Sequence, residues 1–339
     1  MRYGALKVVN HRRMKLVALA LALVLLVPSA IVVYSWLNSR PSLEAYDALT
    51  MPQASSDAPI TVRFAGVSTL VFNDGETAWM TDGFFTRPSW LRVGLTKIEP
   101  DRAAIEQGLK RLGVEKLAAV IPLHSHYDHA MDAPLTATQT GAMLIGSEST
   151  LNIGRGLGMS EDRMLKVTPD ESISLGKWKL TFIKSRHAPP DDHSGPPVDT
   201  IDKPLVPPAA SSAWAVGDTW TLFVEHKSGA RMLVIGSAGF EPSSLDGIRA
   251  DTVFLGIALL HKQPEDYKRQ WWDENVKSVG ARRIIPIHWD DFGRSLEDPL
   301  VALPYVADNV GATMSEISDW SRRDGVELRM PPQFTPFAP

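Results

Sequence analysis

Residues 124–129 read His-Ser-His-Tyr-Asp-His and concentrate three of the chain's nine histidines within six positions. His124 and His126 are two residues apart, so in an extended segment their imidazoles project to the same side. Three imidazoles and the Asp128 carboxylate are costly to pack together unless they share a partner. A divalent cation is such a partner, and His and Asp ligands suit zinc first, with iron or manganese as alternatives. The pattern therefore favours a metal site over a solvated histidine-rich loop.

The elements around this motif alternate between strands and helices. The apolar run Leu117–Pro122 predicts a buried strand that leads directly into His124. Asp101 and Gly113 are typical start and stop residues of a helix that lies between them. Strand-rich stretches, each followed by helical ones, predict two sheets with helices outside. Further strands are expected at 61–65, 68–72, 77–81, 143–145, 164–167, 178–185, 214–226, 230–235, 251–256 and 282–287, and further helices at 264–279 and 299–310.

Composition excludes several classes of protein. The 339 residues include no cysteine, which excludes disulfides, iron–sulfur clusters, cysteine-ligated zinc and a cysteine nucleophile. The net charge is −4 and the pI is about 6.1, so no basic field favours a nucleic-acid partner. Hydrophobic residues make up 44% of the chain, which excludes a disordered protein.

The N-terminus has the pattern of a membrane anchor. Residues 1–15 carry five basic residues and no acidic one, and Leu16–Trp36 is uncharged over 21 residues. A helix of that length spans a hydrocarbon core of about 30 Å. The basic flank stays in the cytoplasm, which places the rest of the chain across the membrane, on the periplasmic side in a bacterium. A cleaved signal peptide is the alternative, although Pro28 fits the cleavage pattern poorly. Residues 37–58 are expected as a linker, and residues 59–339 as one folded domain.

The histidine motif resembles the signature of the metallo-β-lactamase superfamily, and other stretches follow in the order expected of it. They are Phe64–Gly66 with Met80–Gly83, Ser185–Ala188, Gly236–Gly239 and Ile285–Trp289. The resemblance implies an α+β fold, a four-layered αβ/βα sandwich. The Pro-x-His-Trp ending of the last stretch is most similar to the branch that contains ascorbate-phosphate lactonases and N-acyl-phosphatidylethanolamine phospholipase D.

The same resemblance implies two metal ions, most simply zinc, in a dinuclear site. The ligands carried over from the family pattern are His124, His126 and His187 for one ion, and Asp128, His129 and His288 for the other. It further implies that a metal-bound hydroxide attacks the substrate and that Asp128 accepts its proton. Ser237 departs from the pattern, because most of the superfamily has a bridging aspartate there, so the second ion is expected to be held less tightly.

Four other residues are candidates for supporting the site or contacting substrate. Asp82 closes the opening strands and is a candidate acceptor for a ligand imidazole N–H. Tyr127 lies inside the motif as a hydrogen-bond donor or a packing residue. His193 lies in a proline-rich loop after His187, and His261 ends an apolar run where a substrate loop is expected.

Three functions from different classes remain open on the sequence. The first is a membrane-anchored metal-dependent hydrolase of a phosphodiester, lactone or related ester, with a small-molecule or lipid-like substrate. The second is a lactam hydrolase. The third is a non-catalytic, metal-stabilised scaffold of the same fold.

Overall fold

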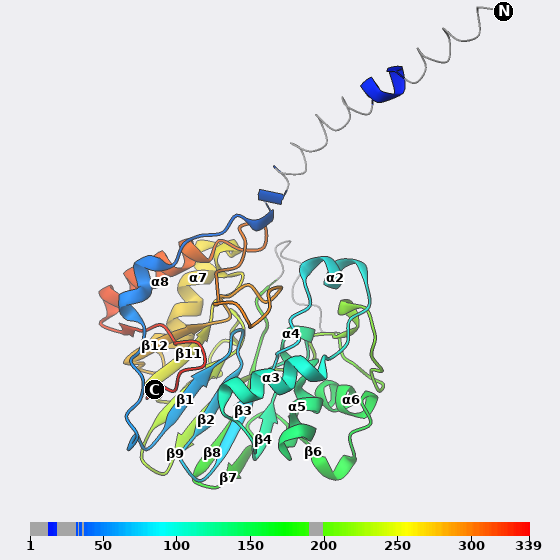
Figure 1. The fold of residues 1–339 in the computed structure, drawn as a ribbon. Coiled ribbons are helices and arrows are strands. Elements are labelled where there is room, and N and C mark those ends of the chain that lie inside the picture. Colours follow the sequence, from blue (N-terminus) through cyan, green and yellow to red (C-terminus); the bar gives the residue numbers. More distant parts are fainter. Residues whose placement is uncertain (1–12, 19–31, 33, 36, 190–198) are drawn as a thin grey trace, which may run out of the picture.

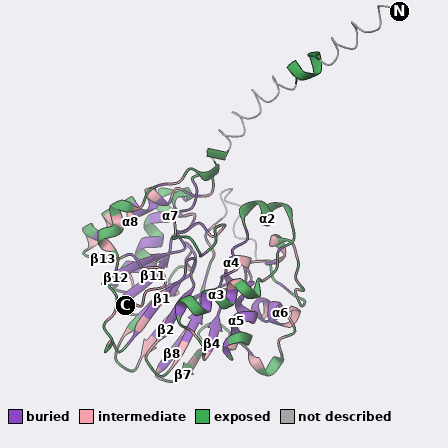
Figure 2. Ribbon diagram, in the orientation of Figure 1, coloured by how far each residue is buried: buried purple, intermediate pink, exposed green. Residues whose placement is uncertain are grey.

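A computed structural model describes residues 13–18, 32, 34–35, 37–189 and 199–339. Two β-sheets pack face to face at the centre, and helices lie on the outer side of each (Figure 1). This mixed α+β arrangement with two sheets agrees with the expected fold. The strands form the buried interior, while most exposed residues lie on helices and loops (Figure 2).

The first sheet has six strands in sequential order, antiparallel from β1 to β3 and parallel from β3 to β6. Its parallel half is what brings the carboxyl ends of neighbouring strands to one edge. The strands are β1 (Thr61–Phe64), β2 (Leu70–Asn73), β3 (Ala78–Thr81), β4 (Ala119–Ile121), β5 (Met143–Gly146) and β6 (Met164–Lys166).

The second sheet has seven strands, antiparallel from β7 to β10 and parallel from β10 to β13. The expected strand at 178–185 is confirmed in full, whereas the strand expected from residue 214 begins only at Thr219. The strands are β7 (Ser172–Leu175), β8 (Trp178–Ser185), β9 (Thr219–His226), β10 (Arg231–Ile235), β11 (Thr252–Gly256), β12 (Arg283–Ile287) and β13 (Glu327–Leu328).

Alternation along the strands decides which core each side chain enters. In the first sheet Phe64 and Phe72 face the second sheet, whereas Val71 faces the opposite way. Between the sheets, the Phe72 and Trp79 rings stack with centroids 4.3 Å apart, and Trp178 of the second sheet meets Trp79 edge-on at 5.9 Å. These aromatic contacts fix the two sheets against each other.

Three helices cover the outer face of the first sheet: α3 (Arg102–Leu112), α5 (Ala133–Thr140) and α6 (Glu148–Gly156). The predicted boundaries of α3 are confirmed. The Asp101 side chain accepts hydrogen bonds from the N–H groups of Ala103 and Ala104, and Gly113 ends the helix in the left-handed conformation.

The second sheet is covered by α7 (Glu265–Trp272), its π-helical continuation Asp273–Lys277 and α8 (Val310–Asp324). The prediction of a helix over 299–310 is wrong, because α8 begins only at Val310, where the Asn309 side chain caps it. Pro299 and Pro304 lack the N–H that a helix interior requires. The remaining short helices are η1 (Glu44–Leu49), α2 (Trp90–Leu95), α4 (Tyr127–Ala130), η2 (Glu161–Arg163), η3 (Ser211–Ala213) and η4 (Leu260–Lys262).

The predicted membrane segment, 16–36, lies largely outside the described residues. Within the described ranges no helix is both long and apolar enough to cross a membrane.

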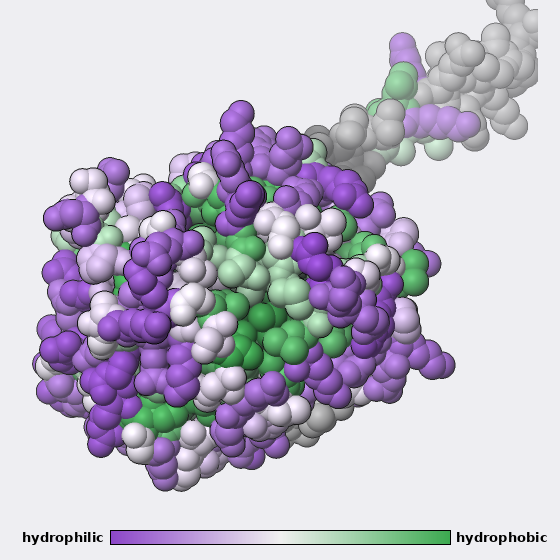
Figure 3. Space-filling view, turned by 90° about the horizontal axis from the view of Figure 1, so that it is seen from below, coloured by the Kyte–Doolittle hydropathy of each residue, from purple (hydrophilic) through white to green (hydrophobic). Residues whose placement is uncertain are grey.

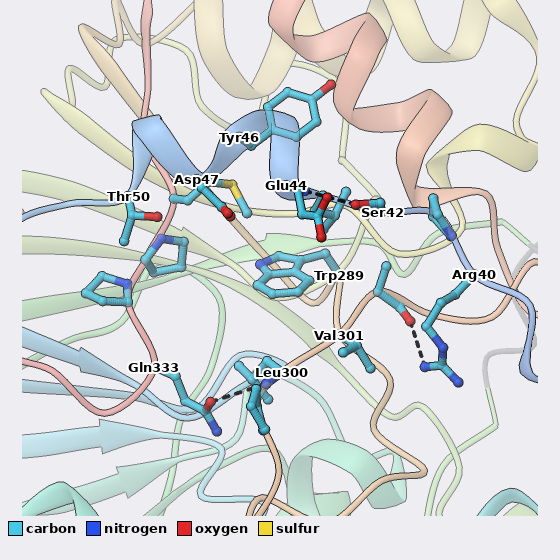
Figure 4. A pocket seen from close by; sticks show the side chains of 17 residues that line it. Arg40, Ser42, Glu44, Tyr46, Asp47, Thr50, Trp289, Leu300, Val301 and Gln333 are labelled. Atoms are coloured by element: carbon cyan, nitrogen blue, oxygen red, sulfur yellow. Dashed lines mark hydrogen bonds between the residues drawn. The ribbon is translucent and has the colours of Figure 1, made fainter.

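Residues 39–58, expected to be a free linker, run instead along the surface of the domain. Arg40 Nη1 lies 2.8 Å from Asp291 Oδ2, and the N–H of Met51 donates to Met330 O at 2.9 Å. Met51 is buried, and Tyr46 of η1 packs on the main hydrophobic core. A cavity of about 540 Å³ separates η1 from Trp289 and the chain around Leu300 (Figure 4). The expectation of a linker does not hold for 39–58, because regularly spaced apolar side chains there find partners in the core.

This docking predicts that Met51 contributes to stability. Replacing Met51 by Ala leaves a cavity against Met330 and is expected to cost roughly 2–5 kcal/mol of unfolding free energy. Gln53→Ala, at an exposed neighbouring position, is the control and is expected to cost almost nothing. Urea denaturation followed by tryptophan fluorescence measures both. Equal midpoints for the two variants would mean that the segment is a free linker after all.

Candidate metal centre

Three chain segments at the carboxyl ends of strands bring the predicted ligands together. His124 and His126 follow β4, and Asp128 and His129 lie on α4 directly after them. His187 follows β8, and His288 follows β12. These segments come from both sheets, so the site lies at one edge of the central layer.

The first group consists of His124, His126 and His187. His124 Nε2 and His126 Nδ1 are 3.1 Å apart, and one nitrogen of each of the three residues lies within 4.8 Å of the others. His187 Nδ1 lies 2.9 Å from Ala188 O. A carbonyl oxygen can only accept, so Nδ1 carries the proton and Nε2 presents its lone pair to the group.

The second group consists of Asp128, His129 and His288, all buried. The Nε2 atoms of His129 and His288 are 3.1 Å apart, and Asp128 Oδ2 lies 3.3 Å from His288 Nε2. Asp82 Oδ2 lies 2.7 Å from His129 Nδ1, on the far side of that ring. The carboxylate accepts a hydrogen bond from Nδ1–H, so His129 Nε2 also presents a lone pair.

The electrostatics of the centre differ between its two groups. Burial, together with the neighbouring His126, lowers the pKa of His187 to about 3, so this imidazole is neutral. Burial by itself would lower the pKa of His129, but Asp82 and Asp128 outweigh it and raise that pKa. Burial by itself would raise the pKa of the Asp128 carboxyl, but His129 and His288 outweigh it and hold that pKa below its usual range. A cation bound in the second group would take the place of the proton that these residues attract.

The separations within each group fit a divalent cation. Two nitrogens that each lie about 2.0–2.1 Å from one tetrahedral zinc ion are about 3.3 Å apart. The close pairs here are 3.1 Å apart in both groups, a separation that an N–H···N hydrogen bond between the two rings also gives. The ring centroids of His124 and His129 are only 3.8 Å apart, so the two groups adjoin and could hold a pair of ions.

The other candidate residues have varied surroundings. Asp82 contacts His129 as described. The Tyr127 ring packs against Phe84 with centroids 6.1 Å apart, which is a packing role. Ser237 Oγ accepts the N–H of Ala188 at 2.9 Å and so holds the chain next to His187. His261 is exposed on η4, where no described contact joins it to either group, and His193 lies outside the described residues.

A buried ion pair supports His288, and its arginine carries no signature in the sequence. Arg87 Nη2 lies 2.7 Å from Asp290 Oδ2, and both side chains are almost fully buried. Asp290 Oδ1 accepts the N–H of Val67, whose carbonyl accepts the N–H of His288, both at 2.7 Å. A Cβ at Gly66 would lie 1.9 Å from Arg87 Nη2, so this position requires glycine.

The backbone beside the centre is strained. Val67, Asp82, Arg87 and His288 all have positive φ, between 43° and 56°, although none is glycine. Such conformations cost about 1–3 kcal/mol each and persist where surrounding contacts enforce them. Here the contacts are the Arg87–Asp290 pair and the hydrogen bonds of Asp82.

A second aspartate joins the centre to the N-terminal segment. Asp291 Oδ1 accepts the Trp90 indole N–H at 2.8 Å, while its Oδ2 pairs with Arg40. The Trp90 ring packs on Phe292 with centroids 4.7 Å apart, and Phe292 packs on His288 at 5.5 Å. The loop after β12 thereby connects α2, the segment 39–58 and a predicted ligand.

No family model matches the chain, and no curated protein sequence matches it. Solved structures do. One is Igni18, described as a novel metallo hydrolase from the archaeon Ignicoccus hospitalis, with 13% identity, a TM-score of 0.49, and coverage of 80% of this chain and 94% of that one. Another is the metallo-β-lactamase fold protein YhfI from Bacillus subtilis, with 12% identity, a TM-score of 0.46, and coverage of 82% and 98%. A third is CmlA, a diiron β-hydroxylase from Streptomyces venezuelae, with 10% identity, a TM-score of 0.48, and coverage of 83% and 54%.

The buried ion pair predicts strong coupling between two positions. Arg87→Met and Asp290→Asn each leave a buried group without its charged partner, which is expected to cost roughly 3–5 kcal/mol of stability. The double variant is expected to cost clearly less than the sum of the two. Chemical denaturation of the four proteins measures the coupling. Additive effects would show that the pair does not interact as described.

Proposed function

We propose that this protein is a metal-dependent hydrolase with a dinuclear centre. The observation that carries the proposal is the pair of adjoining three-residue groups, His124, His126 and His187 beside Asp128, His129 and His288. Five imidazoles and one carboxylate suit zinc, and iron and manganese are the alternatives. A scaffold without activity gives no reason for two convergent groups supported by strained backbone.

Divalent ions in the two groups would supply Lewis-acid polarisation and a water that loses its proton near neutral pH. The chain's own residues would orient the reaction. Asp128, ionised and next to both groups, is placed to take a proton from the attacking water. Asp82 keeps His129 in the tautomer that leaves Nε2 free, and Ser237 fixes the chain beside His187.

For the substrate we propose a phosphodiester, lactone or related ester, small or lipid-like. Support comes from the segment Ile285–Trp289, whose Pro-x-His-Trp ending is similar to the lactonase and phospholipase branch of the metallo-β-lactamase superfamily. The uncharged segment 16–36 supports attachment to a membrane with the domain on the translocated side. Such attachment suits a substrate that resides in the bilayer.

The proposal predicts about two divalent ions per chain, and loss of function when a ligand is removed. His126→Ala is expected to lose metal and nearly all turnover on a panel of phosphodiesters, lactones and lactams, because it removes a nitrogen from the first group. His226→Gln, which alters a histidine at the far end of β9, is the matched control. Elemental analysis and turnover are measured together.

Each outcome is informative. A content near one ion would mean that only one group is filled, and no bound metal would refute the proposal. Turnover confined to lactams would favour the lactam hydrolase instead.

Asp82→Asn tests the tautomer argument. An amide N–H facing His129 would turn Nδ1 into the acceptor and move the imidazole proton to Nε2, which blocks ligation. Metal affinity is expected to fall about 10–100-fold. Asp74→Asn is the control, because it changes a carboxylate that lies 3.2 Å from another histidine, His226. Metal titration with a competing chelator measures both, and equal affinities would contradict the role of Asp82.

A further inference from the structure

Exposed apolar side chains gather at one end of the domain. Between residues 39 and 339, seven large apolar side chains of the described chain are exposed. Leu91 and Leu95 are the most exposed of those on α2, at 70% and 76%, and they lie four residues apart on the same helical face. The seven are Trp90, Leu91, Leu95, Leu165, Val206, Tyr305 and Val306.

Five of these seven lie on α2 or near the point where the N-terminal segment joins the domain. Val206 is the exception beside Leu165, because the N–H of the preceding Leu205 donates to Asn152 O of α6. The N–H of Tyr305 donates to Ser39 O at 2.8 Å. In Figure 1, α2 lies in the upper half of the domain.

Seen from below, the opposite end has a hydrophobic patch that hydrophilic side chains surround (Figure 3). Of the seven exposed side chains, Leu165 lies on β6, at that end. What distinguishes α2 is its connection to the N-terminal segment, because Asp291 binds both Trp90 and Arg40.

The charges around α2 also suit a lipid surface. Arg92 and Lys97 are exposed beside the leucines, and the first turn of α2 holds no acidic residue. Leucine and tryptophan flanked by basic side chains are typical of a helix that lies in the interface of an anionic membrane.

The site is close to this surface. Trp90 begins α2, and its ring reaches His288 through Phe292, with centroid separations of 4.7 Å and 5.5 Å. Asp291 binds both Trp90 and Arg40. Because the chain is held from Ser39 onward, the segment 16–36 is joined to the domain by only a few residues, so a bilayer that holds 16–36 must lie next to the end that carries α2.

We infer that Leu91 and Leu95 of α2, together with Tyr305 and Val306, form a membrane-contacting surface that turns the metal centre toward the bilayer in which 16–36 is anchored. The occupant of the apolar face is the lipid surface itself. The inference rests on the proposed membrane segment and, for its consequence, on the proposed hydrolytic function. A substrate would then reach the centre from the lipid–water interface.

The absence of cysteine from the sequence allows a direct test with the full-length chain. Leu91→Cys and Leu95→Cys are labelled with an environment-sensitive fluorophore, and Leu165→Cys, exposed on β6, is the matched control. The proteins are reconstituted in vesicles of phosphatidylcholine and phosphatidylglycerol. We expect the fluorescence emission of labels at 91 and 95 to shift to the blue and to be quenched by nitroxide-bearing lipids. The emission of the label at 165 is expected to be quenched instead by aqueous iodide. Equal responses at all three positions, or failure to associate with vesicles, would overturn the inference.

A second measurement separates this inference from the proposed function. The double variant with Leu91→Asp and Leu95→Asp is expected to reduce turnover of a vesicle-borne ester. Turnover of a soluble short-chain ester and the metal content are expected to stay unchanged. Leu165→Asp is the control. An equal loss on both substrates would contradict a surface role. Lipid quenching in a protein without bound metal or activity would leave the surface supported and refute the hydrolase.

Discussion

Buried imidazole nitrogens that face one another at short range need a shared proton or a shared cation, and two such pairs dominate this structure. His124 faces His126, and His129 faces His288, each at 3.1 Å, with Asp128 Oδ2 3.3 Å from His288 Nε2. A cation in each group would bind all three of its side chains at once, whereas a hydrogen bond joins only two nitrogens. The arrangement of the surrounding loops is best understood as what keeps these atoms together.

That convergence depends on residues whose backbone φ angles are unfavourable by themselves. Val67 is β-branched and His288 carries a bulky ring, yet both have positive φ. The Arg87–Asp290 pair and the hydrogen bonds that pass through Val67 hold them there. Both charges of that pair are buried, so the pair holds Asp290 firmly in place. Because Asp290 binds Val67 and Val67 binds His288, the ion pair also determines where His288 lies. Strain stored beside the centre is typical of a site that must be pre-arranged before its ligand arrives.

The loop after β12 gives the centre a connection to the outer surface. Three consecutive acidic or aromatic positions, Asp290 to Phe292, face three different neighbours: the buried arginine, the N-terminal segment and α2. The path of the N-terminal segment and the geometry of His288 therefore depend on one short stretch of chain. A free linker would have left the two independent.

The sequence by itself determined the chemistry of the centre and much of its frame. The spacing of residues 124–129, the apolar run that leads into them, and the boundaries of α3 follow from local rules of periodicity and capping. The resemblance carried by short motifs also selected His187 and His288, far away in the chain. Local rules failed where context overrides them, as at 299–310, which is irregular, and at 39–58, whose apolar residues pack on the domain. Only the tertiary structure decided that Arg87 meets Asp290 and that α2 lies beside the centre. Each of these contacts joins residues that are distant in the chain and become neighbours only after both sheets have packed. No local pattern in the sequence predicts such a contact.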